Sequence, residues 1–191
     1  MTKKIYLIRH GETLWSLSGQ HTGRTDLDLT PNGELEAKRL GQRLKGISFT
    51  HIFCSPLKRA IETCRLAGFF DHAVLDARLK EWDYGSYEGL TKKDIQAQNP
   101  NWNIFNDGAL NGESVLDIKN RADQVLDSLS TLQGNIALFS HGHFLRALAT
   151  RFLNLPVQDG RLFYLSSGSI SILSYEEQCP IMQLWNETAK A

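Results

Sequence analysis

Cysteine is scarce in this chain of 191 residues, and the three that occur, Cys54, Cys64 and Cys179, form no CxxC pair. An odd number of widely spaced cysteines argues against a disulfide framework or a cysteine zinc site and fits a reducing compartment. Long apolar runs are also missing. No stretch reaches the ~18 residues of a transmembrane helix, and the apolar run before Arg9 is too short for a signal peptide. We therefore expect a cytoplasmic protein that does not bind a membrane.

An excess of charge of either sign is absent as well, because 21 Lys and Arg residues balance 21 Asp and Glu residues. A chain without net charge has no general affinity for nucleic acid, so an anion must be bound by a local cluster of basic side chains. Hydrophobic residues make up 41% and charged residues 22%, as in globular proteins. The length favours one domain over residues 1–191. The sequence does not set the oligomeric state and is compatible with a homo-oligomer.

Short strand patterns alternate with helical patterns along most of the chain. We expect strands at 5–8, 50–54, 72–75 and 135–139, and helices at 31–44, 56–64, 113–132 and 144–153. This alternation predicts a three-layer α/β fold, in which helices cover both faces of a mainly parallel sheet. Strand patterns at 163–165, 169–173 and 181–184 predict an antiparallel edge, the last two as a hairpin. We expect a loop at 14–28 and an irregular lid or insert at about 79–112, with a helical turn or two at 91–98.

Two of the expected strands end in a histidine followed by a glycine, His10 after the first strand and His141 after the fourth. Ligands of open α/β sheets bind outside the carboxyl ends of the strands, so both imidazoles are expected in one crevice. Arg9 precedes His10, and Arg59 lies in the first turn of a helix that follows another strand. Because guanidinium groups and helix N-termini both favour anions, these four side chains could surround one phosphoryl group.

A metal site is the competing interpretation of the same residues. His10, Asp83, His141 and His143 could be ligands, and a two-metal site would suit a phosphate substrate. However, the chain has no HExxH motif, no Asp-rich strand end and no Cys/His array. We therefore expect no metal and no other cofactor.

Cleavage of a phosphate ester without a metal needs a nucleophile, cations and a group that handles protons. A neutral His10 can attack phosphorus, while Arg9, Arg59 and a protonated His141 stabilise the charge on the phosphoryl oxygens. The leaving oxygen must gain a proton and the later attacking water must lose one. Glu81, or its neighbours Asp83 and Glu88, could do both if burial raised the pKa of the carboxyl group, and spacing alone does not choose among the three.

Four segments together resemble the histidine phosphatase superfamily, which includes the cofactor-dependent phosphoglycerate mutases. They occur in the family's order: LIRHGET at 7–13, SPLKRA at 55–60, LKEWDYG at 79–85 and SHG at 140–142. The resemblance implies that His10 becomes transiently phosphorylated and that Glu81 is the acid and base. It also assigns Arg59 and His141 to the family's second and third phosphate-binding segments.

Departures from the mutase pattern favour a phosphatase. Ser16, Gln20 and Trp82 stand where the mutases carry Asn, Arg and Arg, and residues 95–112 contain none of the Lys and Arg residues with which mutases hold a second charged group. A mutase must retain a doubly charged bisphosphate until it phosphorylates the enzyme again. We therefore expect hydrolysis of a small phosphorylated molecule, with cofactor-dependent phosphoglycerate mutase as the alternative.

Further segments resemble the sedoheptulose-1,7-bisphosphatase type, namely 15–27, 81–89, 102–108 and 111–114. That resemblance implies a phosphorylated sugar with several hydroxyl groups, bound by uncharged polar side chains, with Trp82 or Trp102 against the sugar. A non-catalytic phospholigand-binding module is the other class of function, and it is disfavoured because every reactive residue is present. The aromatic middle could also be only a packed lid. The expected substrate-binding residues are Arg9, Arg59, Ser16, Gln20, Thr22, Gly23, Gly142, Trp82 and Asn103.

Overall fold

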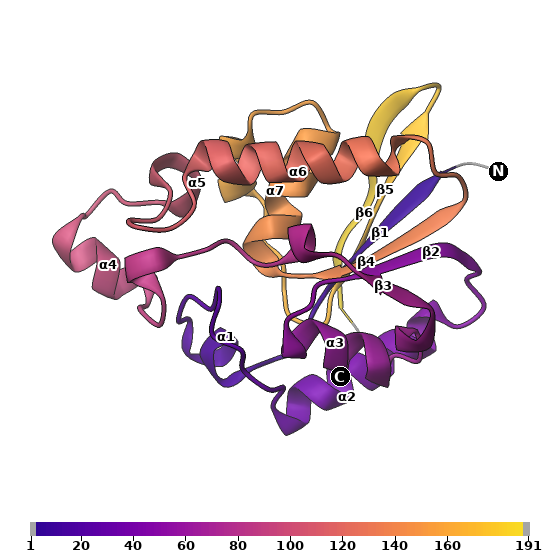
Figure 1. Ribbon diagram of the computed structural model, residues 1–191, viewed down its shortest axis with the longest axis horizontal. Coiled ribbons are helices and arrows are strands. Elements are labelled where there is room, and N and C mark those ends of the chain that lie inside the picture. Colours follow the sequence, from indigo (N-terminus) through magenta and orange to yellow (C-terminus); the bar gives the residue numbers. More distant parts are fainter. Residues whose placement is uncertain (1–2, 189–191) are drawn as a thin grey trace.

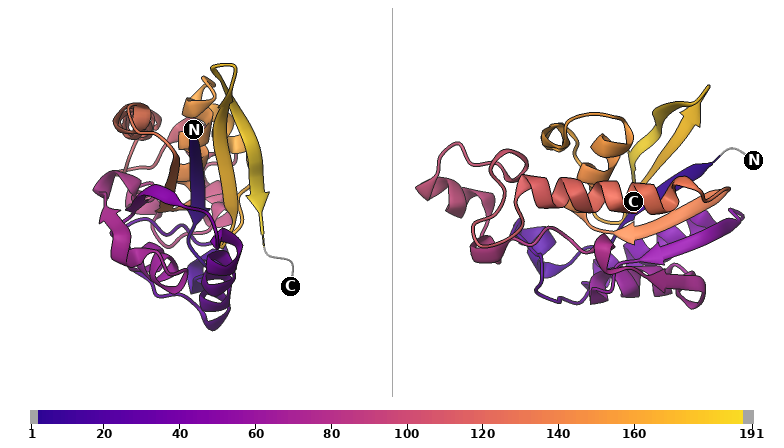
Figure 2. Two further views of the ribbon diagram at one scale, coloured as in Figure 1. Left: turned by 90° about the vertical axis from the view of Figure 1, so that its right-hand side faces the viewer. Right: turned by 45° about the horizontal axis from the view of Figure 1, so that its top comes forward.

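A six-stranded sheet forms the centre of the computed structural model, which describes residues 3–188. Its strands are β1 (Lys4–Arg9), β2 (Phe49–Cys54), β3 (Ala73–Leu75), β4 (Asn135–Ser140), β5 (Ile170–Glu176) and β6 (Cys179–Glu187), in the order β3-β2-β4-β1-β5-β6. β1 to β4 run parallel, β5 is antiparallel to β1, and β6 is antiparallel to β5. The hairpin β5–β6 forms one edge of the sheet (Figure 2). The mainly parallel sheet with an antiparallel edge is confirmed.

Helices cover both faces of the sheet (Figure 1). α2 (Pro31–Leu44) and α3 (Lys58–Leu66) pack on one face, and α6 (Val115–Ser130) and α7 (Gly142–Phe152) pack on the other. Alternate residues of β1 supply the two cores, because successive side chains of a strand point to opposite faces. Ile5 and Leu7 belong to the core under α6 and α7, and Tyr6 and Ile8 to the core under α2 and α3. The predicted three-layer α/β fold is confirmed.

Short elements account for most differences from the expected structure. The segment predicted as a loop contains α1 (Leu14–Ser18), which begins at a capping box of Thr13 and Ser16 and buries no residue, so it leaves no apolar pattern. The irregular segment holds α4 (Lys92–Gln98), as expected, and also α5 (Ile104–Asp107). The strand predicted at 163–165 is wrong. Leu165 is buried there, but its carbonyl accepts a hydrogen bond from Arg9 instead of pairing with a strand.

The segment that carries Glu81 is fastened to the fold by Arg121 of α6. The guanidinium donates to both carboxylate oxygens of Glu113, at 2.8 and 2.6 Å, and to the carbonyls of Arg78 and Lys80, at 2.8 and 2.6 Å. These side chains are only 15% and 17% exposed. A bidentate pair that also bonds backbone carbonyls fixes this segment against the helix layer.

All three cysteines are free thiols, with Cys54 and Cys64 buried and Cys179 exposed. None of the helices in the described range 3–188 combines the length and apolarity that crossing a membrane would take.

Replacing Arg121 with Met tests the fastening of this segment. We expect the free energy of unfolding to fall by about 3 kcal/mol, because the carboxylate of Glu113 loses its cation and keeps only the N–H of Asp83, while two carbonyls lose their donor. Urea denaturation followed by circular dichroism measures the change. Arg161, an exposed arginine that pairs with Asp159, is the control, and its replacement should cost less than about 0.5 kcal/mol. Equal losses in both variants would contradict the fastening role.

Candidate active site

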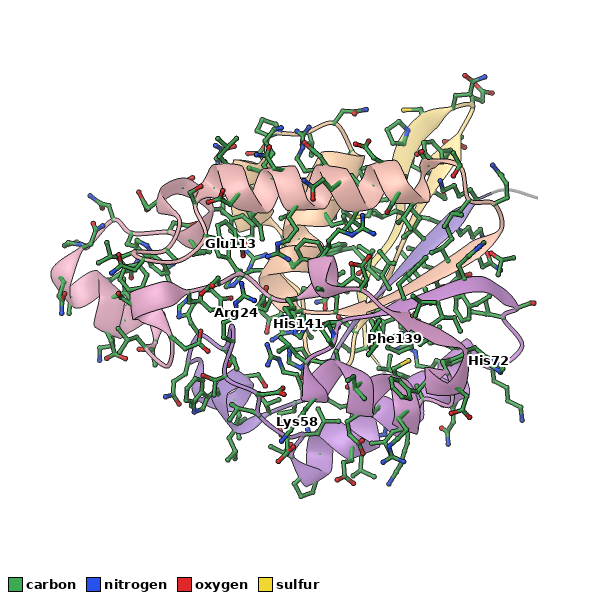
Figure 3. All side chains as sticks on the ribbon, viewed as in Figure 1. Arg24, Lys58, His72, Glu113, Phe139 and His141 are labelled. Carbon is green, nitrogen blue, oxygen red and sulfur yellow. The ribbon has the colours of Figure 1, made fainter. Side chains whose placement is uncertain are left out.

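The pairing of β1 with β4 brings the two predicted histidines together. Arg9 lies opposite Ser140 in the parallel register, so His10 and His141 leave the sheet side by side. Their ring centroids are 5.1 Å apart. His141 lies near the centre of the molecule in Figure 3, where the strand ends meet the loops. The strand order thus creates one site from segments more than a hundred residues apart.

His10 is held as a neutral imidazole with one nitrogen available. Its Nδ1 lies 2.7 Å from the carbonyl oxygen of Gly11, and because a carbonyl only accepts, Nδ1 carries the proton. Nε2 then bears the lone pair, and it has no hydrogen-bond partner within residues 3–188. Burial, together with the positive charges of Arg59 and Arg9, holds the pKa of His10 well below its usual value.

Arg59 is fully buried in a cradle of backbone carbonyls. Its Nη atoms donate to the carbonyl oxygens of Thr25 (3.0 Å), Thr22 (2.9 Å) and Gly23 (3.1 Å). Its Nε donates to Nδ1 of His141 at 3.2 Å. Four of the five N–H groups of the guanidinium are used in this way, which fixes the plane of the cation beside the two histidines.

His141 is neutral rather than protonated, which corrects the expectation that it is a cation. Because arginine only donates, the bond from Arg59 requires an unprotonated Nδ1, and Nε2–H then donates to Oγ of Ser55 at 2.7 Å. Burial, followed by the charge of Arg59, holds the pKa of His141 well below its usual value. His141 therefore orients Arg59 and contributes no charge of its own.

Glu88 braces the loop that forms the cradle of Arg59. One carboxylate oxygen of Glu88 accepts from the backbone N–H groups of Gly23 (2.9 Å) and Thr25 (3.0 Å), and the other accepts from Gly23 (3.0 Å). A Cβ atom at Gly23 would lie 2.6 Å from the carbonyl oxygen of Trp82 and 2.7 Å from this carboxylate. Gly23 thus permits close packing of the loop and does not line the cavity.

Glu81 lies at the N-terminus of α7. One of its carboxylate oxygens accepts from the backbone N–H groups of Trp82 (2.9 Å) and Phe144 (2.8 Å), and the other accepts from His143 (3.0 Å). The first turn of a helix presents such unsatisfied N–H groups, and a carboxylate there is favoured by the helix dipole. Three backbone donors therefore fix the position of this group at the cavity wall.

Geometry distinguishes the three carboxylates that spacing could not. Glu81 lines the cavity, whereas Asp83 pairs with Arg24 at 3.0 Å and Glu88 bonds loop amides. Only Glu81 of the three is therefore placed to meet a bound molecule.

The cavity beside His10 has a volume of about 170 Å³, which suits a small molecule. Most of the predicted residues line it: Arg9, His10, Ser16, Gln20, Thr22, Glu81 and Gly142. Arg59 and His141 lie buried behind this lining. The expected polar, uncharged side chains are therefore present on the wall formed by α1 and the loop that follows.

Trp82, Trp102 and Asn103 do not face the cavity. Trp82 is fully buried, and its indole N–H donates to the carbonyl oxygen of Glu113 at 2.9 Å, while Trp102 is 2% exposed. The side chain of Asn103 caps the N-terminus of α5 by accepting from Phe105. The expectation of a tryptophan against a sugar is wrong because these aromatic residues form the core under the irregular segment.

Arg9 and the glycines next to the histidines pack closely. A Cβ atom on Gly142 would lie 3.3 Å from Cζ of Arg9, so the glycine makes room for the guanidinium. The Nη1 atom of Arg9 donates to Leu165, and its buried Nε has no acceptor among residues 3–188. Gly11 packs against the start of α2, since a Cβ atom there would lie 2.3 Å from the carbonyl oxygen of Gly33.

Sequence reasoning missed several residues of the cavity wall, among them His21, Tyr84 and Arg146. For Arg146 a signal existed, because it lies four residues after Gly142 on α7 and hence on the same face of the helix. No signal of this kind marks His21 or Tyr84, which reach the cavity through irregular segments. Among residues 3–188, no three His, Cys, Asp or Glu side chains are grouped so that they could hold a metal ion.

The chain is similar in sequence to several known proteins. The chain is 41% identical over 177 residues to an acid phosphatase of Mycobacterium tuberculosis, covering 91% of this chain and 87% of the relative. It is 36% identical over 191 residues to a sedoheptulose 1,7-bisphosphatase of Saccharomyces cerevisiae, covering 83% and 70%. It is also 32% identical over 192 residues to a "Probable phosphoglycerate mutase GpmB" of Erwinia tasmaniensis, covering 95% and 89%.

A solved structure of an open reading frame product from Mycobacterium tuberculosis has the same fold, with a TM-score of 0.94 and 36% identity over 98% of this chain and 99% of that one. The family description "Histidine phosphatase superfamily (branch 1)" matches residues 5–188. The chain belongs to the histidine phosphatase superfamily.

Proposed function

We propose that this histidine phosphatase hydrolyses phosphomonoesters of small sugars, without a metal, through a phosphohistidine on His10. The observation that carries the proposal is the state of His10. It is a neutral imidazole in the cavity wall next to Arg9, with Arg59 buried behind that wall, and its Nε2 has no hydrogen-bond partner among residues 3–188. A free lone pair on nitrogen next to cations that attract phosphoryl oxygens is what in-line attack on phosphorus requires.

The reaction has two steps that share one acid and base. In the first, Nε2 of His10 forms a bond to phosphorus, the ester P–O bond breaks, and the leaving oxygen takes a proton from Glu81, which has to enter this step as the carboxylic acid rather than as the carboxylate. In the second, water attacks phosphorus, the P–N bond breaks, and Glu81 takes the proton of the water. Arg9 and Arg59 stabilise the charge on the phosphoryl oxygens in both steps. The unpaired Nε of Arg9 supports this role, since a buried donor without an acceptor is costly until a ligand supplies one.

The lining of the cavity supports a sugar phosphate as substrate. Ser16, Gln20 and Thr22 give this lining uncharged polar side chains, the kind that suits a sugar. Each also forms a hydrogen bond within the protein, Ser16 to Thr13, Gln20 to Gly89 and Thr22 to Gln20, so a sugar would share or replace these bonds. The relative named as a sedoheptulose 1,7-bisphosphatase points to the same class.

Phosphoglycerate mutase is the second candidate, since relatives of that name exist. A mutase has to retain a bisphosphate intermediate, which needs several cations around both phosphates. Lysine is absent from the cavity lining within the described residues, and Arg9 and Arg146 are its two arginines. This small number of cations favours transfer of the phosphoryl group to water.

Phosphate release from sugar phosphates and from 3-phosphoglycerate, measured in EDTA, tests the proposal. We expect hydrolysis of at least one sugar phosphate, an acid-labile phosphoenzyme after a pulse of labelled substrate, and loss of both in His10→Ala by about 10³-fold or more. His72→Ala is the control, because His72 is exposed and lies far from His141 in Figure 3. Isomerisation of 3-phosphoglycerate with little release of phosphate would instead indicate a mutase.

The protonation state of His10 provides a second test. Because burial and two arginines lower its pKa, the imidazole should become protonated only at a pH below the 6.5 of an unperturbed histidine. Two-dimensional ¹H–¹⁵N spectra of the imidazole nitrogens, recorded from pH 7.5 to 5 and assigned by comparison with His10→Ala, report this directly. A midpoint at or above pH 6.5 would contradict the proposed electrostatics.

The bracing of Arg59 by Glu88 leads to a third test. In Glu88→Ala the amides of Gly23 and Thr25 lose their acceptor, so the carbonyl cradle shifts, and we expect kcat/KM for p-nitrophenyl phosphate to fall about 10- to 100-fold. Glu88→Gln keeps one acceptor oxygen and should restore part of the loss. Glu62→Ala is the control, because Glu62 is a half-buried carboxylate on α3 that pairs with Arg65 and does not line the cavity. An unchanged kcat/KM in Glu88→Ala would show that the cradle does not depend on Glu88.

A further inference from the structure

Arg146 projects from α7 into the wall of the cavity and is held in place on two sides. Its Nε donates to the carbonyl oxygen of Gly160 at 2.9 Å, and its guanidinium lies over the ring of Phe105, 4.6 Å from the ring centroid. No hydrogen bond from its Nη atoms to a protein group is formed within residues 3–188. The guanidinium is therefore oriented by its Nε–H bond to Gly160 and by the ring of Phe105 against its plane. Its Nη atoms remain available to a ligand.

The support beneath Arg146 is tightly packed. Phe105 packs edge-on against Trp82 with ring centroids 5.5 Å apart. A Cβ atom on Gly160 would lie 2.3 Å from Cε1 of Phe105, so the backbone of Gly160 presses on the ring. Because neither the ring nor the carbonyl can shift easily, the guanidinium is preorganised and loses little freedom when it binds an anion.

The charge of Arg146 is not balanced by an acidic side chain. It forms no ion pair within residues 3–188, whereas Arg151, five residues later on α7, pairs with Asp123 at 2.8 Å. Glu81 lines the same cavity, but its carboxylate already accepts from three backbone N–H groups. Burial lowers the pKa of Arg146 to about 10, which leaves it charged at neutral pH.

Three other side chains of the cavity wall, His21, Tyr84 and His143, bring no charge of their own. Burial lowers the pKa of His21 and holds that of His143 well below its usual value, so both are neutral at neutral pH. Burial also raises the pKa of Tyr84, so that its hydroxyl stays protonated. Of the charged residues that line the cavity with Arg146, Glu81 attracts it and Arg9 repels it, but neither forms an ion pair with it within residues 3–188. An anionic ligand group would complete this arrangement.

We infer that Arg146 binds a second anionic group of the substrate, a phosphate or a carboxylate, apart from the phosphoryl group that His10 receives. This inference rests on the proposed function and narrows it to phosphomonoesters that carry such a group. Arg146 thereby selects among substrates. Arg59 and Arg9 are the charges that act on His10, and Arg146 is not among them, because it is anchored to Gly160 and Phe105 instead.

Matched substrate pairs test the inference. Fructose 1,6-bisphosphate is compared with both fructose monophosphates, and 3-phosphoglycerate with sn-glycerol 3-phosphate, in wild type and Arg146→Met. We expect the preference for the doubly anionic member, taken as a ratio of kcat/KM values, to fall about 10- to 100-fold and mainly through KM. The pair whose ratio falls identifies phosphate or carboxylate as the recognised group. Arg146→Lys, which keeps the charge, should restore part of the preference.

Arg151→Met is the matched control, since it removes an arginine from the same helix without touching the cavity, and it should leave both ratios unchanged. Ratios that do not fall in Arg146→Met, or that fall equally in Arg151→Met, would overturn the inference. Calorimetric binding of the same compounds to His10→Ala, with and without Arg146→Met, separates it from the proposed function. If the wild type hydrolyses no phosphomonoester, the proposed function is refuted. If, in addition, Arg146→Met weakens binding to His10→Ala only for the doubly anionic compounds, the role of Arg146 in binding the second anionic group is still supported.

Discussion

The parallel pairing of β1 with β4 is the constraint on which the site depends. The register that sets Arg9 opposite Ser140 also sets His10 beside His141. A slip of one residue would turn every side chain of β1 to the opposite face of the sheet. Ile5 and Leu7 would then face α2 and α3 instead of α6 and α7. Packing of the two cores therefore fixes the register, and the register fixes the separation of the two imidazoles.

Electrostatics around His10 follows from how the buried cations are held. Arg59 is surrounded by backbone carbonyls, whose dipoles offset part of the cost of burying its charge. Burial lowers the pKa values of the neighbouring imidazoles, and the positive charge of Arg59 lowers them further. The same guanidinium groups that suit a phosphoryl group thus add to the effect of burial in keeping His10 unprotonated.

The sequence predicted the long helices, the strands and the residues at the strand ends, because each of these leaves a pattern of apolar and polar residues within a short stretch of the chain. Apolar periodicity revealed the sheet and the helices that cover it, whereas α1 and α5 are too short to carry a period. Trp82 was misinterpreted for a different reason. An aromatic residue in an irregular segment can serve the core or a ligand, and the choice depends on distant packing partners such as Glu113. Arg146 was not predicted because the motif at 140–142 ends before it, although Arg146 lies on the same face of α7 as Gly142.

Backbone groups supply most of the framework around the reacting residues. Carbonyls orient His10 and Arg59, and N–H groups hold Glu81. These atoms are common to nearly all amino acids, so the framework survives as long as the path of the chain is kept. Lineages of this fold can therefore drift far apart in sequence while the chemistry is preserved, and a new substrate can be acquired through a few wall positions such as Ser16 and Gln20.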